Sequence, residues 1–433
     1  MIRPRRAGSP PQTAPSCGLS LVLNAALVLA LIVATLDSEA MPIGSAVDKG
    51  LSMHPKVAAA EAELRAAGTD VAIAKDGYWP MVQASAGPEN SLWGDIGWNV
   101  SATQMLYDWG RVKARVAEAS AKERQLYHNL KVATEEAALD IAEVYLDILL
   151  YEARLATADR YIERLGELAA VTRDRAEHGY ADRSEAERTR LELARAQEQR
   201  SIERGSLLEA SNNYKELVGA PALELQWPKA PQVANVTYPP DSTDPALFDA
   251  PRYQKAVANV DAAEAARAES KAALKPKLNL EGNLLRRKIG GHMETDSVLS
   301  LTVRFDAMQG LSSFRRVDAA MSREQAARWN QIAEGRDLRR ELNTHAELNH
   351  VVQSRLSLLE DQLKNVRDVA EAYQEQFEVG NRGIDDLLPI QRELFEAERL
   401  ADELRSQHIR LQYRAASQLG RLGSLLSEQT SSR

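Results

Sequence analysis

Cysteine is almost missing from this chain of 433 residues, and aromatic side chains make up only 5% of it. The one cysteine, Cys17, precedes an apolar run near the N-terminus. A disulfide framework, a cysteine nucleophile and a thiolate metal site are therefore excluded from the rest of the chain. Few aromatic residues beside 27% charged residues are typical of long helices that pair side by side, and less so of a compact enzyme.

Motifs that carry chemistry are also scarce. His345 and His350 lie five residues apart on one expected helix, a poor spacing for two ligands of one metal ion, and His408 falls on an apolar seam. No glycine-rich phosphate loop and no nucleophile elbow occurs. The chain has a formal charge of −8 and no basic stripe, and both features argue against a nucleic-acid partner. We expect neither an enzyme nor a bound metal or cofactor.

Residues 1–40 have the pattern of a signal peptide for export. An apolar run over residues 19–36 is followed by a small-residue cleavage site at Ser38-Glu39-Ala40. The positive end is provided by three arginines, Arg3, Arg5 and Arg6. Cleavage removes these three and two acidic residues, so the formal charge of −8 becomes −9. The alternative is a retained anchor helix, because about 18 apolar residues approach the length of a membrane span.

Two parts of the chain repeat one order of features. Residues 54–80 align with residues 250–276 without a gap at an offset of 196, and in each a proline ends an Ala/Glu-rich helical pattern. Landmark glycines then recur at an offset of 201: Gly179 and Gly219 in the first copy, Gly380 and Gly420 in the second. The chain is a tandem duplication of a unit that reads helix, β-hairpin, long helix, turn, long helix.

Apolar residues follow the 4-3 spacing of a coiled coil on both sides of the glycine turns, so the helices are expected to pair along narrow seams. Before the second turn they are Val352, Leu356, Leu359, Leu363, Val366, Ala370, Tyr373 and Phe377, and the first copy keeps this register from Tyr151 to Ala176. The proline-free runs Gly110–His178 and Gly310–Val379 predict continuous helices on the order of 100 Å long. Return helices are expected to end at Leu217 and Leu419.

Between the shorter and longer helices, apolar and polar residues alternate, for example from Val82 to Ala86 and from Leu299 to Phe305. This period is typical of a membrane β-barrel with a wet lumen, and also of an ordinary half-buried sheet. The parity slips near Gln104–Met105, which predicts a bulge. The basic run Arg286–Lys288 is expected in the second hairpin loop, facing either solvent or anionic lipid headgroups.

Four strands cannot close a barrel, and open sheet edges are not stable in hydrocarbon. Three chains related by cyclic symmetry would supply twelve strands. The expected fold is therefore mainly α with membrane β: duplicated coiled-coil hairpins and two β-hairpins that form a trimeric twelve-stranded β-barrel and an α-barrel. The predicted boundaries are a signal peptide at 1–40, repeats at 41–220 and 251–423, a Pro-rich linker at 221–250 and a polar tail at 424–433.

The order of these features resembles the TolC-like outer membrane factor family, and the likeness covers essentially the whole mature sequence. Four local motifs carry it: Leu106-Tyr107-Asp108-Trp109-Gly110 before the first long helix, a degraded copy in Phe305-Asp306 with Gly310, Val218-Gly219-Ala220-Pro221 at the end of the first repeat, and Phe377–Leu388 with Gln391 and Leu394–Ala397. The last motif is similar to the tip of the family's second helical hairpin, with a leaning toward its type I secretion branch.

The resemblance implies a homotrimer in the outer membrane of a Gram-negative bacterium, with a helical tunnel that extends into the periplasm. Such proteins are passive exit ducts for inner-membrane pumps of the ABC or RND type, and a periplasmic adaptor (membrane fusion) protein docks on them. Protein secretion and drug efflux use the same duct, so the cargo stays open. The alternative function is an inner-membrane-anchored periplasmic adaptor or a structural coiled coil.

The resemblance also implies a gate and a constriction at the helical tips. Arg382 falls at the family's gate arginine, and Glu185 falls where its partner aspartate usually lies. Asp386 would form a ring of three carboxylates that attracts cations, while Asp385 faces another way as a cap or surface residue. The alternative for Arg382 and Glu185 is that both are solvated helix charges, worth at most about 1 kcal/mol. The alternative for the segment around Asp386 and Pro389 is simple helix initiation.

The same resemblance implies that the adaptor docks on exposed tip residues. The expected docking residues are Gly179, Tyr180, Ser184, Gly380, Asn381 and Gly383. The glycines have an alternative role, because glycine commonly terminates a helix.

Overall fold

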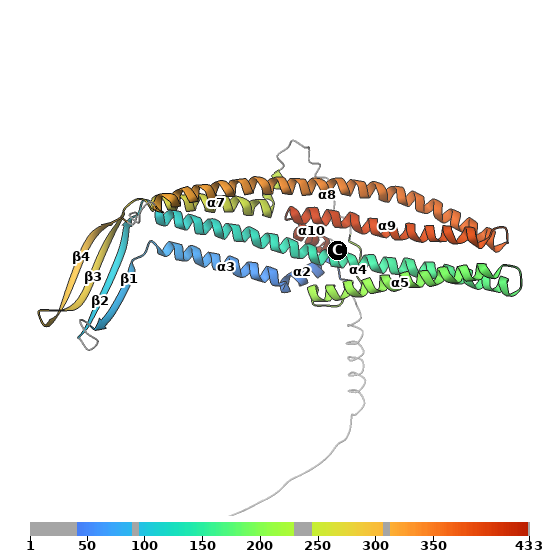
Figure 1. Ribbon diagram of the computed structural model, residues 1–433, viewed down its shortest axis with the longest axis horizontal. Helices are drawn as coiled ribbons and strands as arrows, with labels where there is room; N and C mark the ends of the chain where they lie inside the picture. The colour runs from blue at the N-terminus through green and yellow to red at the C-terminus, as the bar shows by residue number, and fades with distance from the viewer. Residues whose placement is uncertain (1–40, 89–94, 229–244, 306–311, 432–433) are drawn as a thin grey trace, which may run out of the picture.

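The computed structural model describes residues 41–88, 95–228, 245–305 and 312–431. The molecule is elongated, with a β-sheet at one end and, at the other, the two turns that each join a pair of helices (Figure 1). The predicted signal peptide, residues 229–244 of the linker, and the Asp306 and Gly310 motif residues lie outside the described residues.

The duplicated unit is confirmed element by element. The first copy consists of α2 (Ile43–Met53), α3 (Pro55–Asp76), β1 (Met81–Pro88), β2 (Ile96–Tyr107), α4 (Arg111–Glu177) and α5 (Arg183–Val218). The second consists of α6 (Pro245–Asp249), α7 (Pro251–Ala272), β3 (Lys277–Ile289), β4 (His292–Arg304), α8 (Ser312–Glu378), α9 (Ile384–Gln418) and a final α10 (Leu422–Ser431). The long helices α4 and α8 have 67 residues each.

The motif around Asp108 starts the first long helix. Trp109 and Gly110 both have positive φ angles, 58° and 84°, which directs the chain sharply into α4. The buried carboxylate of Asp108 accepts hydrogen bonds from the backbone N–H groups of Gly110 at 2.9 Å and Val112 at 2.6 Å. These bonds pair N–H groups that the first turn of a helix leaves without partners.

The four strands form one antiparallel sheet in the order β1-β2-β3-β4, so the two hairpins join through β2 and β3. The register shifts between Met105 and Tyr107, which confirms the predicted bulge. The predicted location of the basic run in the hairpin loop was wrong. Arg286–Lys288 lie within β3, and the tight turn is made by Gly290 and Gly291 at φ angles of 61° and 97°. Glycine accepts this left-handed conformation more readily than residues with a side chain do.

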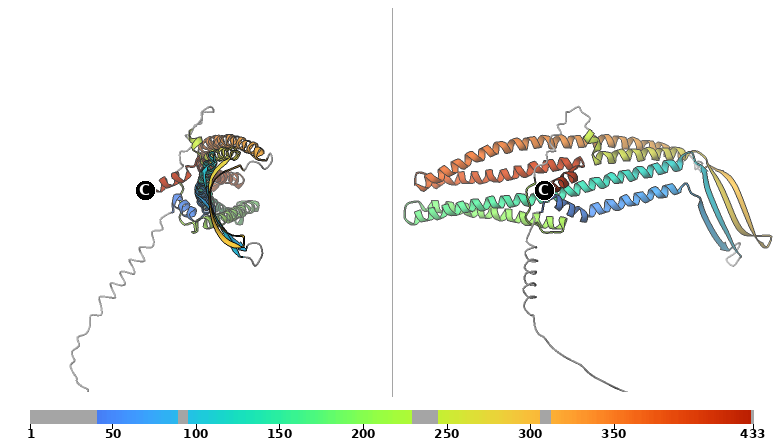
Figure 2. Two further views of the ribbon diagram at one scale, coloured as in Figure 1. Left: turned by 90° about the vertical axis from the view of Figure 1, so that its left-hand side faces the viewer. Right: turned by 180° about the vertical axis from the view of Figure 1, so that it is seen from behind.

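The helices form one curved layer (Figures 1 and 2). Near the sheet the neighbours run in the order α3, α4, α7, α8, and near the tips they run α5, α4, α9, α8. The expected seam is buried, with Val352, Leu359, Leu363, Val366 and Ala370 in one apolar cluster with α9. Helix α4 therefore connects the two repeats along its whole length.

A denser apolar core lies at the middle of the molecule, where α2 and α10 pack on α4, α5 and α9. The predicted polar tail, residues 424–433, is corrected here, because Leu426 of α10 is buried in this core. The Glu135 carboxylate of α4 accepts a 3.0 Å hydrogen bond from the Leu422 N–H and so stabilises the start of α10. The predicted linker likewise contains α6, whose Leu247 is buried.

Glycine at the end of α9 is tested by one pair of variants. Gly420 and Gly179 have φ angles of 70° and 76°, so Gly→Ala at either position costs about 1–2 kcal/mol in backbone strain. A Cβ at Gly420 would lie 2.5 Å from Pro251 Cγ, whereas Gly179 has open space. We expect Gly420→Ala to lower the thermal melting temperature clearly more than Gly179→Ala does. Equal shifts would contradict the close packing of Gly420 on Pro251, the first residue of α7.

Candidate functional site at the helical tips

Both hairpin tips are built by one backbone motif. The N–H of Tyr180 donates to the carbonyl of Arg175, and the N–H of Asn381 donates to the carbonyl of Gln376, both at 2.8 Å. Between them Gly179 and Gly380 take the left-handed conformation. These contacts are the Schellman ending of a helix, so the role of helix terminator accounts for both glycines.

The expected docking residues lie around these turns. The side chain of Tyr180 is 84% exposed, and Val379 beside the second turn is 71% exposed. Ser184 donates its backbone N–H to the Asp182 carboxylate at 3.1 Å, and this hydrogen bond holds the pKa of Asp182 below its usual value. Gly383 occupies the N-cap position of α9. The tips thus present one exposed apolar side chain each on a rigid turn.

Arg382 makes its contacts within its own hairpin. Its guanidinium carbon lies 3.6 Å from the centre of the Tyr373 ring, and its Nε donates to Gln376 Oε1 at 2.9 Å. Its Nη1 is 3.3 Å from Asp386 Oδ2, so the predicted gate arginine and the predicted constriction carboxylate form one ion pair. Among the described residues of one chain, no contact joins Arg382 to Glu185. Their link stays a prediction for contacts between chains.

Two other arginines join the hairpins at the tips. Arg175 of α4 donates to the carbonyl oxygens of Phe377 at 2.9 Å and Glu378 at 3.1 Å, the end of α8 where unpaired carbonyls collect. Arg188 of α5 forms an ion pair with Asp385 of α9. The sequence analysis missed both arginines, because each partner lies about 200 positions away in the chain.

A buried carboxylate forms the strongest polar contact between the hairpins. The side chain of Glu192 in α5 is only 7% exposed. It accepts a hydrogen bond from the Tyr161 hydroxyl of α4 at 3.0 Å and from Arg392 Nε of α9 at 2.8 Å, and the second Arg392 nitrogen also binds it. Arg195 lies 3.4 Å away. Three helices from both repeats therefore meet at one charge.

The pKa of Glu192 records the balance of forces at this contact. Burial alone would raise it, but the hydrogen bonds from Arg392 and Tyr161 and the nearby positive charge outweigh burial, so the pKa is lowered. Burial and the adjacent negative charge of Glu192 raise the pKa of the Tyr161 hydroxyl. The site thus holds an ionised carboxylate and a neutral phenol at neutral pH.

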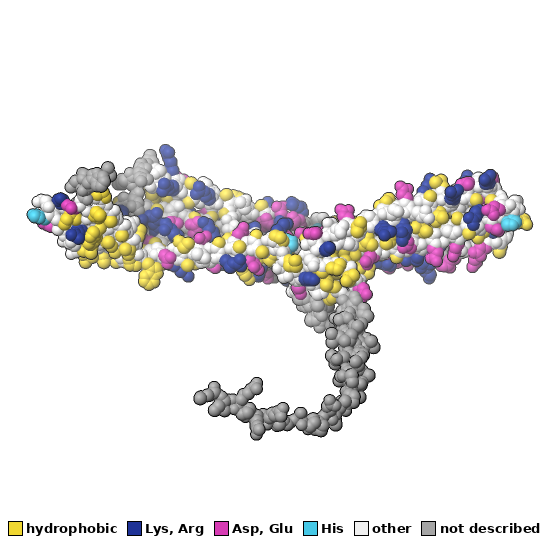
Figure 3. Space-filling view, turned by 90° about the horizontal axis from the view of Figure 1, so that it is seen from below, with side chains coloured by type: hydrophobic (Ala, Val, Ile, Leu, Met, Phe, Trp, Pro, Cys, Tyr) yellow, Lys and Arg dark blue, Asp and Glu magenta, His cyan; other side chains and the backbone are white. Residues whose placement is uncertain are grey.

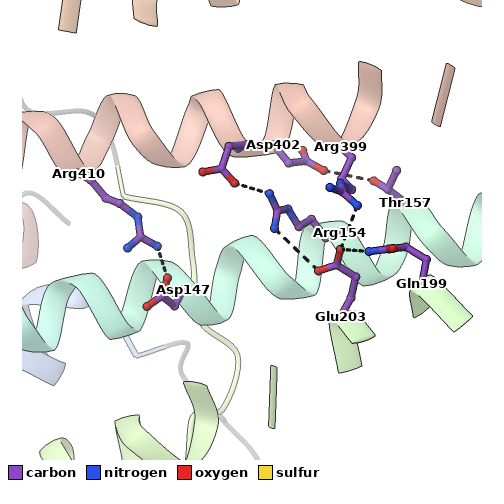
Figure 4. A network of polar contacts seen from close by, with 9 residues as sticks. Asp147, Arg154, Thr157, Gln199, Glu203, Arg399, Asp402 and Arg410 are labelled. Atoms are coloured by element: carbon purple, nitrogen blue, oxygen red, sulfur yellow. Dashed lines mark hydrogen bonds and ion pairs between the residues drawn. The ribbon is translucent and has the colours of Figure 1, made fainter. Parts of the chain in front are cut away.

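Charge pairs continue along α9 toward the middle of the molecule (Figure 4). Glu203 of α5 lies between two arginines, 4.0 Å from Arg154 Nη1 and 3.7 Å from Arg399 Nη1. Arg410 binds Asp147 at 2.5 Å. A groove of about 590 Å³ between α4, α5 and α9 is lined by Glu192 and by the arginines Arg154, Arg392 and Arg399. The seam between α9 and the first hairpin therefore combines these charge pairs with an apolar cluster that includes Leu165, Leu387 and Phe395, whereas the α8–α9 seam has an apolar cluster along its length.

No helix within residues 41–88, 95–228, 245–305 and 312–431 is both long and apolar enough to cross a bilayer. The same ranges contain no group of three or more metal-binding side chains placed to hold an ion.

The sequence matches the family model of the outer membrane efflux proteins over residues 46–220 and 244–426. These two segments span both repeats and most of the chain. The protein therefore belongs to the outer membrane efflux protein family, and the family places it in the outer membrane. A comparison with curated protein sequences gives no significant match.

Solved structures share the fold. The channel protein CusC is 14% identical with a TM-score of 0.76, over 88% of this chain and 92% of that one. The outer membrane channel CmeC of Campylobacter jejuni is 12% identical with a TM-score of 0.75, over 90% and 89%. The outer membrane protein VceC of Vibrio cholerae is 14% identical with a TM-score of 0.75, over 87% and 96%. The predicted TolC-like resemblance is confirmed.

The contact between the hairpins gives a pH prediction. Glu192→Gln removes the negative charge that pairs with Arg392. We therefore expect the free energy of opening of α9, measured by hydrogen exchange, to fall by about 2 kcal/mol. Because the folded-state pKa of Glu192 is lowered, its stabilisation is complete at neutral pH and is lost as the pH falls through that lowered value, below about 4.3. The variant should lack this acid-dependent loss.

Glu187 is the matched control, because it lies on the same helix α5 and is exposed. Glu187→Gln should leave the exchange of α9 unchanged. If the two variants changed the exchange of α9 equally, Glu192 would not be a contact that stabilises α9 against the first hairpin.

Proposed function

We propose that three copies of this chain form a passive exit duct in the outer membrane, as one part of a tripartite export system. A periplasmic adaptor would dock on the tips, and an inner-membrane pump of the ABC or RND type would drive transport. The duct itself would perform no chemical reaction. The observation that carries the proposal is a four-stranded sheet with two open edges and an exposed apolar face.

The sheet supports a shared barrel. β1 and β4 are its two edges, and neither has a second partner strand within the described residues of one chain. Unpaired backbone groups at such edges favour pairing with another chain. Pairing β1 of one copy with β4 of the next would close twelve strands in a trimer.

The helical layer has open edges as well. α8 is one edge, and α3 and α5 form the other. Large apolar side chains are exposed on both, for example Trp329 and Leu358 on α8 and Leu208 on α5. Exposed apolar side chains in this number favour burial against a second copy. A closed ring of helices would continue the barrel as a tunnel.

The tips support a gate. Opening the tunnel at this end would move α9 with α8 away from α4 and α5, which requires the Arg175, Arg188 and Glu192 contacts to break. Arg382 would act beside them by pairing Asp386 and holding the first turn of α9 against Tyr373. The cargo is either a protein, as the second tip's likeness to the type I secretion branch favours, or a small molecule.

The adaptor alternative has less support. An adaptor would have one helical hairpin beside compact β-domains, whereas this chain has two hairpins whose strands join in one sheet at the far end. The first test is the size of the purified protein in detergent together with its conductance in a planar bilayer. A trimer with discrete openings is expected, and a monomer without conductance would overturn the duct.

The gate is tested by Arg382→Ser. Loss of the cation frees the Asp386 carboxylate and the start of α9, so we expect a larger single-channel conductance and stronger cation selectivity. Asp386→Asn should weaken the cation selectivity. Arg173→Ser is the control, because Arg173 is exposed and, among the described residues, pairs only with Glu177 on its own helix. Unchanged conductance in Arg382→Ser would contradict the gate role.

A further inference from the structure

The sheet has one apolar and one polar face, fixed by its register. Val82, Ala102, Gly282 and Leu299 are successive cross-strand partners on one face, since directly opposed residues project to the same side. The polar face carries Gln83, Ser101, Asn283 and Thr302 in the alternate positions. On the apolar face Val82, Val100, Leu284, Leu299, Leu301 and Val303 are 37–75% exposed, and hydrophobic side chains gather at this end of the molecule (Figure 3).

Aromatic side chains mark both ends of this apolar face. Trp98 and Tyr107 lie nine residues apart on β2, and the bulge lets Tyr107 take the place opposite Leu278 on the apolar face. Nine residues span about 30 Å along a strand, or about 23 Å across a membrane at the usual tilt of about 40°. This height is close to the apolar band of about 25 Å in membrane barrels. In the proposed barrel, Trp98 would therefore lie near the level of the lipid headgroups on the side away from the helices.

The charges beside Trp98 are separated between the faces. Arg286 is the cross-strand partner of both Trp98 and Thr295, so it lies on the apolar face. Glu294 is the partner of Arg287, and Asp296 is the partner of Leu285, so both acidic residues lie on the polar face.

Arg286 is the available cation of the apolar face. Lys288, two residues farther along β3, binds Asp95 at 2.6 Å. Arg286 is exposed and forms no ion pair with any described residue. An exposed guanidinium, a threonine hydroxyl and an indole N–H thus lie together where hydrocarbon ends.

We propose that Arg286, with Thr295 and Trp98 beside it, binds the phosphate group of a lipid in the outer leaflet. The guanidinium is suited to phosphate because its planar N–H groups form two parallel charge-assisted hydrogen bonds. The acidic residues on the polar face do not oppose an anion at this site. The inference rests on the proposed barrel, and a trimer would carry three such sites.

Adjacent arginines on opposite faces provide the test. Purified trimers of the wild type, Arg286→Gln and Arg287→Gln are titrated with bisphosphorylated lipid A and with the same lipid after its phosphates are removed, and binding is read by native mass spectrometry. The wild type should bind the phosphorylated lipid more tightly. Arg286→Gln should weaken that binding about tenfold, and Arg287→Gln should leave it unchanged.

Three outcomes would overturn the site. Equal binding by all three proteins would remove Arg286 as a ligand, and so would equal binding of the lipid without phosphates. Complete competition by millimolar inorganic phosphate would show a site for the free anion in place of a lipid. Planar-bilayer conductance of the same samples separates this failure from failure of the duct, because the duct stands if all three form channels.

Discussion

The structure depends on one constraint: its long helices lie side by side in one curved layer, to which the short helices α2 and α10 add packing at the middle of the molecule. Each seam is two helices wide and must hold with a narrow row of contacts. The chain meets this constraint with α4, a 67-residue helix that contacts α3, α5, α7 and α9 in turn. Because α4 belongs to the first repeat and α7 and α9 to the second, the duplicated halves form one body through it.

The two seams on either side of α9 differ in the side chains that form them. The α8–α9 seam within the second hairpin is apolar and remains buried in any movement of that hairpin as a unit. The seam between α9 and the first hairpin is mixed: it has an apolar cluster around Leu387 and Phe395, and also two buried carboxylates, Glu192 and Glu203, each between arginines. A buried charge is costly to leave unpaired. Separation along this seam would have to break both kinds of contact.

Local patterns predicted the fold well, because its signals are local. The 4-3 spacing from Val352 to Phe377, the parity slip near Met105 and the glycine offset each identified an element that the structure contains. Contacts between the repeats were not predictable, since Arg188 and Asp385 are 197 residues apart and each looks like a solvated helix charge. The polar tail was mistaken because residues 424–433 are mostly polar, and the two leucines among them, Leu425 and Leu426, pack on the core.

The packing of α10 beside α2 determines when the molecule can finish folding. The central core contains Ile43, Ala46 and Val47 of α2 and Leu422 and Leu426 of α10. A chain leaving a translocation pore N-terminus first would hold α2 without its last neighbour until about 380 further residues had emerged. Closure of the core would then wait for α10 to emerge, and a chain truncated before α10 would keep an apolar surface open to degradation.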